Sequence, residues 1–176
     1  MGDRPKEVRL RPRYWDACLF IDIIQRDKPE RLLVLDGLVK IAKSGKLLVV
    51  TSALTIGEVL YGPEGTQSNS LPEEDIRFVE TFFDQPWISV RAADRRIYRE
   101  AAILRRKYNL ELPDAVHVAT ALAHKEVTIL ETYDEKHLLK LGRKDDPPPI
   151  PIKIPKCPDP PMPLFDHQES SDDTEQ

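Results

Sequence analysis

The chain has 176 residues, which suits one domain with an additional segment, and 40% of them are apolar, enough for a hydrophobic core. Its formal net charge is −4, but the segment from Asp145 onward carries eight acids and only two lysines, so the rest of the chain is mildly basic. No stretch approaches the ~20 apolar residues of a membrane span, no signal-peptide core is seen, and two cysteines make no disulfide framework, so we expect a protein of the reducing cytosol.

The first half of the chain predicts two strands, each followed by helices. The helices show apolar residues at a spacing of three and four, whereas the strands are short continuous apolar runs. In chain order we expect a strand ending near Asp16, a helix through Ile24, a helix over 29–44, a strand over 46–51, a helix over 53–61 and a loop over 62–71.

The second half repeats this alternation. Proline and acids at the start of "PEEDIRFVETFFDQ" are typical of the first turn of a helix, and the helix near residue 100 has a clear apolar stripe. The expected elements are a helix over 72–85, a strand over 87–90, a helix over 93–109, a helix over 112–123, a strand over 127–132 and a short helix over 135–141.

This order predicts an α/β fold with three layers, α/β/α, around a central parallel sheet of about four strands. We expect the domain to cover residues 1–143 and a proline-rich, acidic, disordered tail to cover 144–176. Nine of the residues from Pro147 to Pro163 are proline, which predicts an extended segment that is not packed.

Four acids are expected beyond the carboxyl ends of the strands, where parallel α/β sheets bind their ligands. Asp16 ends the first strand, Glu58 lies in the helix after the second, Asp114 opens a helix, and Asp134 follows the last strand. Carboxylates that converge on a small volume repel one another unless a cation lies between them. Oxygen ligands favour Mg²⁺ or Mn²⁺ over zinc, and a carboxylate-held metal of this kind suits phosphodiester hydrolysis.

Four segments resemble, in order, the sequence blocks of PIN-domain ribonucleases. They are "YWDACLFIDII", "VVTSALTIGEVLYG", "LPDAVHVATALA" and "ILETYDEKHL", within residues 13–141. The resemblance implies a PIN-like fold and a Mg²⁺- or Mn²⁺-dependent endoribonuclease whose catalytic, metal-binding carboxylates are Asp16, Glu58, Asp114 and Asp134. It also implies an RNA substrate and, as in VapC-like toxin–antitoxin pairs, a toxin that forms homodimers and is held inactive by a small antitoxin.

The chain departs from the family's pattern in two blocks. The family has Asp-Thr-Asn or Asp-Thr-Ser in the first block, where this chain has Asp16, Ala17 and Cys18, and Thr-Asn-Asp in the last, where Tyr133 replaces the asparagine. All four carboxylates are present. These departures motivate an alternative function, a catalytically weak or inactive PIN-like module that binds RNA or protein.

Simpler structural roles exist for several of these residues. Asp114 and Asp134 could cap helices, and Glu58 could be a surface acid. Asp22 is a fifth candidate acid, although we expect it on a solvated helix face. We expect His117 to be structural, Tyr14 and Trp15 to belong to the core, and Thr132 to act either as a strand residue or as a partner of a metal-bound water. The basic residues of the 93–109 helix could contact RNA, although a solvated face is the simpler expectation.

Overall fold

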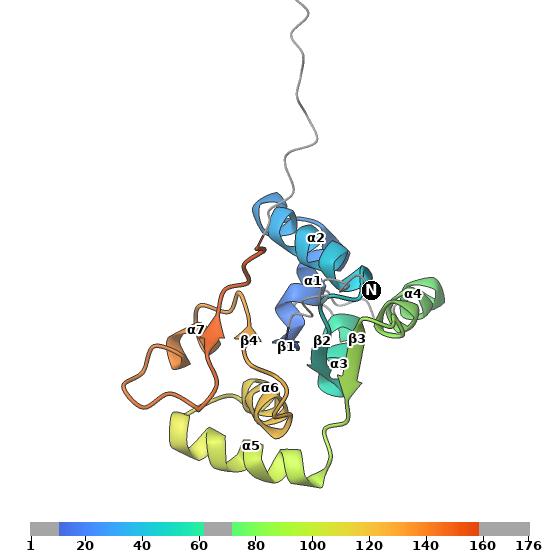
Figure 1. Ribbon diagram of the computed structural model, residues 1–176. Helices are drawn as coiled ribbons and strands as arrows, with labels where there is room; N and C mark the ends of the chain where they lie inside the picture. The colour runs from blue at the N-terminus through green and yellow to red at the C-terminus, as the bar shows by residue number, and fades with distance from the viewer. Residues whose placement is uncertain (1–10, 62–71, 159–176) are drawn as a thin grey trace, which may run out of the picture.

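The computed structural model describes residues 11–61 and 72–158 as an α/β fold with a parallel sheet (Figure 1), as the sequence predicts. Its elements are β1 (Arg13–Trp15), α1 (Ala17–Gln25), α2 (Pro29–Lys43), β2 (Val49–Ser52), α3 (Ala53–Tyr61), α4 (Glu73–Phe83), β3 (Ile88–Arg91), α5 (Arg95–Tyr108), α6 (Leu112–Ala123), β4 (Leu130–Glu131), α7 (Leu138–Leu141) and β5 (Ile152–Lys153). The five strands lie in the order β3-β2-β1-β4-β5 and all pair in parallel. Within the described residues, no helix combines the length and the apolar character that a membrane crossing requires.

The sheet separates two apolar cores, because neighbouring residues of a strand point to opposite faces. Tyr14 and Val50 pack with residues of α5, α6 and α7, whereas Trp15 and Val49 pack with residues of α1, α2 and α4. Figure 1 shows α5 and α6 on one side of the sheet and α1 and α2 on the other. The three predicted layers are therefore present, and Tyr14 and Trp15 are fully buried core residues, as expected.

The fifth strand corrects the expectation that the proline-rich segment is not packed. β5 pairs with β4, and Ile150 and Ile152 are buried in the core on the α6 side of the sheet. Gly142 permits this approach, since a Cβ there would lie 3.0 Å from both the Cβ and the carbonyl oxygen of Ile152. The expectation is thus wrong as far as Pro158, whereas 159–176 and the expected loop over 62–71 lie outside the described residues. The domain boundary at residue 143 stays a prediction.

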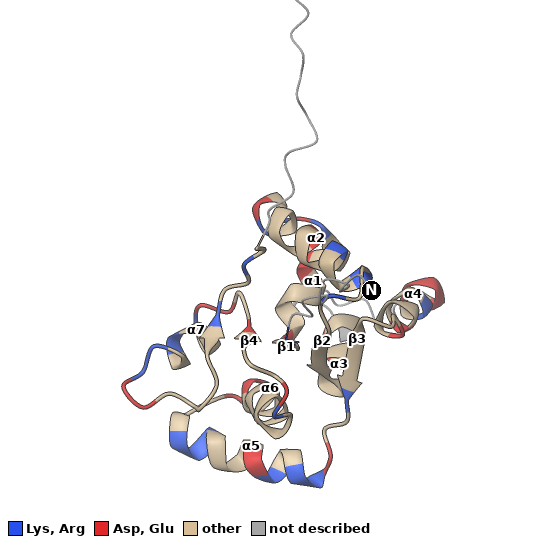
Figure 2. Cartoon of the chain, viewed as in Figure 1, with Lys and Arg blue, Asp and Glu red and all other residues tan. Residues whose placement is uncertain are grey.

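Helix α5 presents a basic outer face and covers α6. Ile97 and Ala101 face the core, while the arginines and Lys107 point outward. Figure 2 shows these basic residues in blue along α5. This is the solvated face that the apolar stripe predicts, and contact with RNA stays a prediction. Lys107 also forms an ion pair with Asp146 over 2.9 Å, which ties the start of the acidic segment to this helix.

Candidate active site

Asp16 lies at the carboxyl end of β1, where its side chain caps α1. Its Oδ1 accepts hydrogen bonds from the Cys18 amide over 3.1 Å and from the Cys18 thiol over 2.8 Å, and its Oδ2 accepts one from the Thr132 hydroxyl. Burial raises the pKa of Asp16, and nearby His117 and these hydrogen bonds oppose the rise only in part. The carboxylate is thus held in a fixed orientation at the sheet edge, in surroundings that disfavour its charge.

The turn after β4 is tied to Asp16 by the same two side chains. The Thr132 hydroxyl accepts a hydrogen bond from the Asp134 amide over 2.8 Å, and the Cys18 sulfur accepts one from the Tyr133 amide over 3.1 Å. Cys18 is one of the residues that differ from the family's pattern in the first block, and it still hydrogen-bonds Asp16. The turn that carries Asp134 is fixed relative to Asp16.

Asp134 closes the turn that leads into α7, although the N-cap residue of that helix is His137, so the expected helix cap is found one turn early. Its Oδ1 accepts hydrogen bonds from the amides of Lys136 and His137, and its Oδ2 accepts one from Leu138. The carboxylate is only partly buried, with 24% of the side chain exposed, so these bonds leave it open toward Asp114 and His137.

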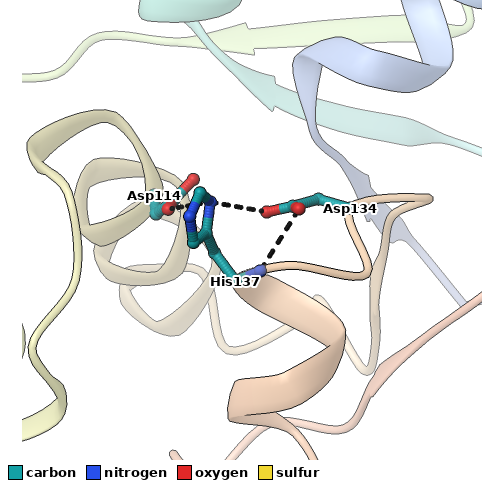
Figure 3. Close-up of side chains that lie close together, drawn as sticks. All are labelled: Asp114, Asp134 and His137. Atoms are coloured by element: carbon teal, nitrogen blue, oxygen red, sulfur yellow. Dashed lines mark hydrogen bonds and ion pairs between the residues drawn. The ribbon is translucent and has the colours of Figure 1, made fainter.

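Asp114 lies in the first turn of α6 and faces Asp134 across the imidazole of His137 (Figure 3). The Nδ1 of His137 is 3.5 Å from Oδ2 of Asp114 and 3.4 Å from Oδ2 of Asp134. Oδ2 of Asp114 is buried and has no hydrogen-bond partner within the described residues. Burial and, next, the charge of Asp134 raise the pKa of Asp114 to about 6. The three ligand atoms lie within 4.8 Å of one another, which makes this group a candidate metal site.

Glu58, on α3, is turned toward His117. The Nε2 of His117 lies 2.8 Å from Oε2 of Glu58, and its Nδ1 lies 2.8 Å from the hydroxyl of Tyr14. Burial lowers the pKa of His117, but the bond to Glu58 and the charges of Glu58, Asp16 and Asp114 outweigh it and raise that pKa. Both ring nitrogens have partners, as expected of a structural histidine, and His117 lies among three of the four predicted acids.

The structure thus brings the predicted acids together to different degrees. Asp114, Asp134 and His137 form one group, to which neither Asp16 nor Glu58 belongs. Asp16 is tied to the turn of Asp134 through Thr132, and Glu58 hydrogen-bonds His117. His137 was missed from the sequence. The sequence does contain a signal for it, because His137 comes three residues after Asp134 at the start of a helix. This spacing places the two side chains on the same face of the turn.

Asp22 is not on a solvated face, so that expectation is wrong. It is almost fully buried, and its two carboxylate oxygens form ion pairs with Lys28 and Arg31 over 2.5 and 2.9 Å. Arg31 also lies over the ring of Tyr133, 4.4 Å from its centroid. Asp22 therefore links α1 to α2, and its oxygens are engaged away from the acidic group.

The family model of the PIN domain matches residues 13–144. The chain belongs to the PIN-domain family. PIN domains are generally nucleases, so the acids at the carboxyl edge lie in a nuclease fold. Among solved structures, the chain is similar to a chain of a toxin–antitoxin complex from Klebsiella pneumoniae, with a TM-score of 0.51 and 19% identity over 72% of this chain and 89% of that one. At that identity the likeness concerns the fold of the PIN domain alone. No curated protein gave a significant match.

Proposed function

We propose that this PIN protein is a metal-dependent endoribonuclease that hydrolyses RNA phosphodiester bonds, with Mg²⁺ or Mn²⁺ held by Asp16, Glu58, Asp114 and Asp134. The observation that carries the proposal is Oδ2 of Asp114, which is buried, faces a second carboxylate and finds no donor in the part of the chain that the structure describes. An unpartnered, buried carboxylate oxygen is costly, and a divalent cation relieves both the burial and the repulsion.

The residues of the site fit such a cation. Their donors are chiefly carboxylate oxygens, which hard divalent ions prefer. The raised pKa of Asp114 reflects burial and the charge of Asp134, and a nearby cation opposes both effects. His117 engages Oε2 of Glu58, whose side chain is 29% exposed, so Oε1 is not part of that hydrogen bond.

The surrounding residues orient these acids. Thr132 and Cys18 hold Asp16 and the turn of Asp134 in one arrangement, and His117 holds Glu58. When bound, the metal would supply a water of lowered pKa and would neutralise charge on the phosphate. The contacts of Cys18 also favour the nuclease over the catalytically weak module, because the changed residue still hydrogen-bonds Asp16.

The test is cleavage of a single-stranded RNA with Mg²⁺ or Mn²⁺ by the wild type and by Asp114→Asn and Asp16→Asn. Each variant should lose about 100-fold or more in rate, since both remove charge that would hold the cation. Asp36→Asn is the matched control, because Asp36 lies on α2 and forms an exposed ion pair with Arg26, outside the group of Asp114, Asp134 and His137. Wild-type rates in both site variants would contradict the assignment.

We further propose that the protein is the toxin of a toxin–antitoxin pair that acts in the cytosol as a homodimer with a small antitoxin as its inhibitor. The likeness of fold to a chain of a toxin–antitoxin complex supports this role. Induced expression of the wild type in a bacterial host should arrest growth, and Asp114→Asn should not. Growth that continues with an active, soluble wild type would argue for an RNA-processing role instead. Light scattering of the purified chain tests the homodimer.

A further inference from the structure

We infer that His137 is itself a ligand of the cation in this site and that its imidazole makes the site select Mn²⁺ over Mg²⁺. The inference rests on the proposed function, because it concerns the same cation. It goes further in adding a nitrogen donor to a set that the sequence predicts as all-oxygen.

The first argument is geometric. Nδ1 of His137 lies 3.5 and 3.4 Å from the nearest oxygens of Asp114 and Asp134, and Figure 3 shows the ring between the two carboxylates. Neighbouring ligands of an octahedral metal with bonds of about 2.1 Å lie about 3 Å apart. The two distances from Nδ1 exceed this spacing by no more than about half an ångström, and the ligand atoms of the three residues all lie within 4.8 Å of one another.

The second argument concerns what these contacts are without a metal. At 3.5 Å, the imidazole is too far from Asp114 for a good hydrogen bond. Oδ2 of Asp114 accordingly counts as unpartnered among the described residues although the ring faces it. A cation between the three atoms would give all of them a partner, which the present contacts do not.

The third argument is the way the chain presents the ring. The amide of His137 donates to Oδ1 of Asp134, and the amide of Leu138 donates to Oδ2, so the turn fixes the backbone of His137 against the Asp134 carboxylate. The side chain of His137 is 52% exposed, whereas that of Asp114 is 16% exposed. An ion arriving from solvent would thus meet the imidazole on its way to the buried oxygen.

The preference between metals follows from donor type. Mg²⁺ is a hard ion that keeps its waters and favours oxygen donors, whereas imidazole suits first-row transition ions, which bind nitrogen more strongly. A site of carboxylates with one imidazole therefore accepts Mn²⁺ with three or more protein ligands and Mg²⁺ with the carboxylates alone.

The experiment measures metal binding directly and does not use RNA cleavage as its readout. Metal-free full-length protein is titrated with Mn²⁺, free Mn²⁺ is followed by electron paramagnetic resonance, and Mg²⁺ is added as competitor. His137→Ala should weaken Mn²⁺ binding by at least about tenfold, because loss of a direct ligand should cost no less than loss of a residue that only supports a ligand. It should change Mg²⁺ binding by less than about twofold. His137→Asp, which supplies oxygen in place of nitrogen, should narrow the ratio of the two affinities by strengthening Mg²⁺ binding.

His124→Ala is the matched control, since His124 pairs with Glu126 at the end of α6, and it should match the wild type. Circular dichroism of each variant reports whether it is folded. Equal weakening of both metals by His137→Ala, or no weakening, would overturn the inference. If Asp114→Asn then still abolished binding, the proposed nuclease site would stand without His137. A wild type that binds neither metal would overturn both.

Discussion

Thr132 connects two acids of the site through one hydroxyl group. The hydroxyl donates to Oδ2 of Asp16 and accepts from the amide of Asp134, and it is fully buried. It therefore makes both of the bonds that a buried hydroxyl needs, and it sets the separation of two strand ends. The sequence left open a strand residue or a partner of a metal-bound water. The structure shows a different role, because Thr132 lies directly after β4 and positions two carboxylates.

Thr132→Val should lower the free energy of unfolding by about 1–3 kcal/mol, because the buried carboxylate of Asp16 and the amide of Asp134 each lose a partner. Thr132→Ser keeps the hydroxyl and should cost less. Urea denaturation of the metal-free proteins measures the difference. Equal stability of the valine and serine variants would show that the hydroxyl bonds contribute nothing.

The raised pKa of Asp114 predicts a pH-dependent stability. Because its pKa is about 6 in the folded state and 3.8 in its ordinary state, the folded chain binds the proton more tightly. That stabilisation is fully present below pH 3.8 and is lost as pH rises toward 6. At pH 7.5 the metal-free wild type therefore carries an uncompensated charge.

Asp114→Asn should be more stable than the metal-free wild type at pH 7.5, by about 1–2 kcal/mol after allowance for solvent screening of a partly exposed carboxylate. The gain should shrink as pH falls from 6 toward 4. Thermal denaturation in EDTA across this range checks the prediction, and saturating Mn²⁺ should remove the gain by stabilising the wild type alone. A variant less stable than the wild type at pH 7.5 would contradict it.

The sequence predicts the place of a site residue where that residue directly follows a strand. Asp16 and Asp134 follow strands that pair in parallel, so their meeting at one edge was predictable. Asp22 was mispredicted because a helix acid has no signal for burial until its partners Lys28 and Arg31 are placed. The spacing of His137 from Asp134 indicates that these two side chains lie together, but His137 was missed because its approach to Asp114, on another helix, depends on the tertiary fold.

At the scale of elements, β5 is the main difference between expectation and structure. The strand has two residues and lies among prolines, so it has neither the length nor the alternation that identifies a strand. It is nevertheless held by pairing with β4 and by the burial of Ile150 and Ile152. A composition rich in proline predicted poor packing, and the tertiary contacts overrode it.

Truncation after Asp146 should therefore destabilise the chain. It removes β5, exposes the edge of β4 and uncovers buried side chains such as Leu141, which amounts to several kcal/mol at about 1.5–3 kcal/mol for each large apolar side chain. Truncation after Pro158, which keeps β5, is the control and should melt at a higher temperature than truncation after Asp146. Equal melting temperatures for the two truncations would contradict the assignment of β5 to the fold.

At the scale of the molecule, the parallel sheet explains the site. Strands β1 and β4 run in the same direction, so the residues after them meet at one edge, while α6 brings Asp114 to that edge from the helical layer that it forms with α5 (Figure 1). The fold class and the order of helices and strands were predictable because each long element has its own apolar period. The strand count and the orientation of Glu58 toward His117 were not, since both depend on contacts between distant segments.

The location of a bound Mn²⁺ tests the central claim most directly. Crystals of the full chain grown with Mn²⁺ would show the ion by its anomalous scattering. A peak between Asp114 and Asp134, within bonding distance of Oδ2 of Asp114, is the predicted result. Full occupancy elsewhere on the protein, or an ordered site with these carboxylates and no peak at millimolar Mn²⁺, would contradict a metal-dependent nuclease at this edge of the sheet.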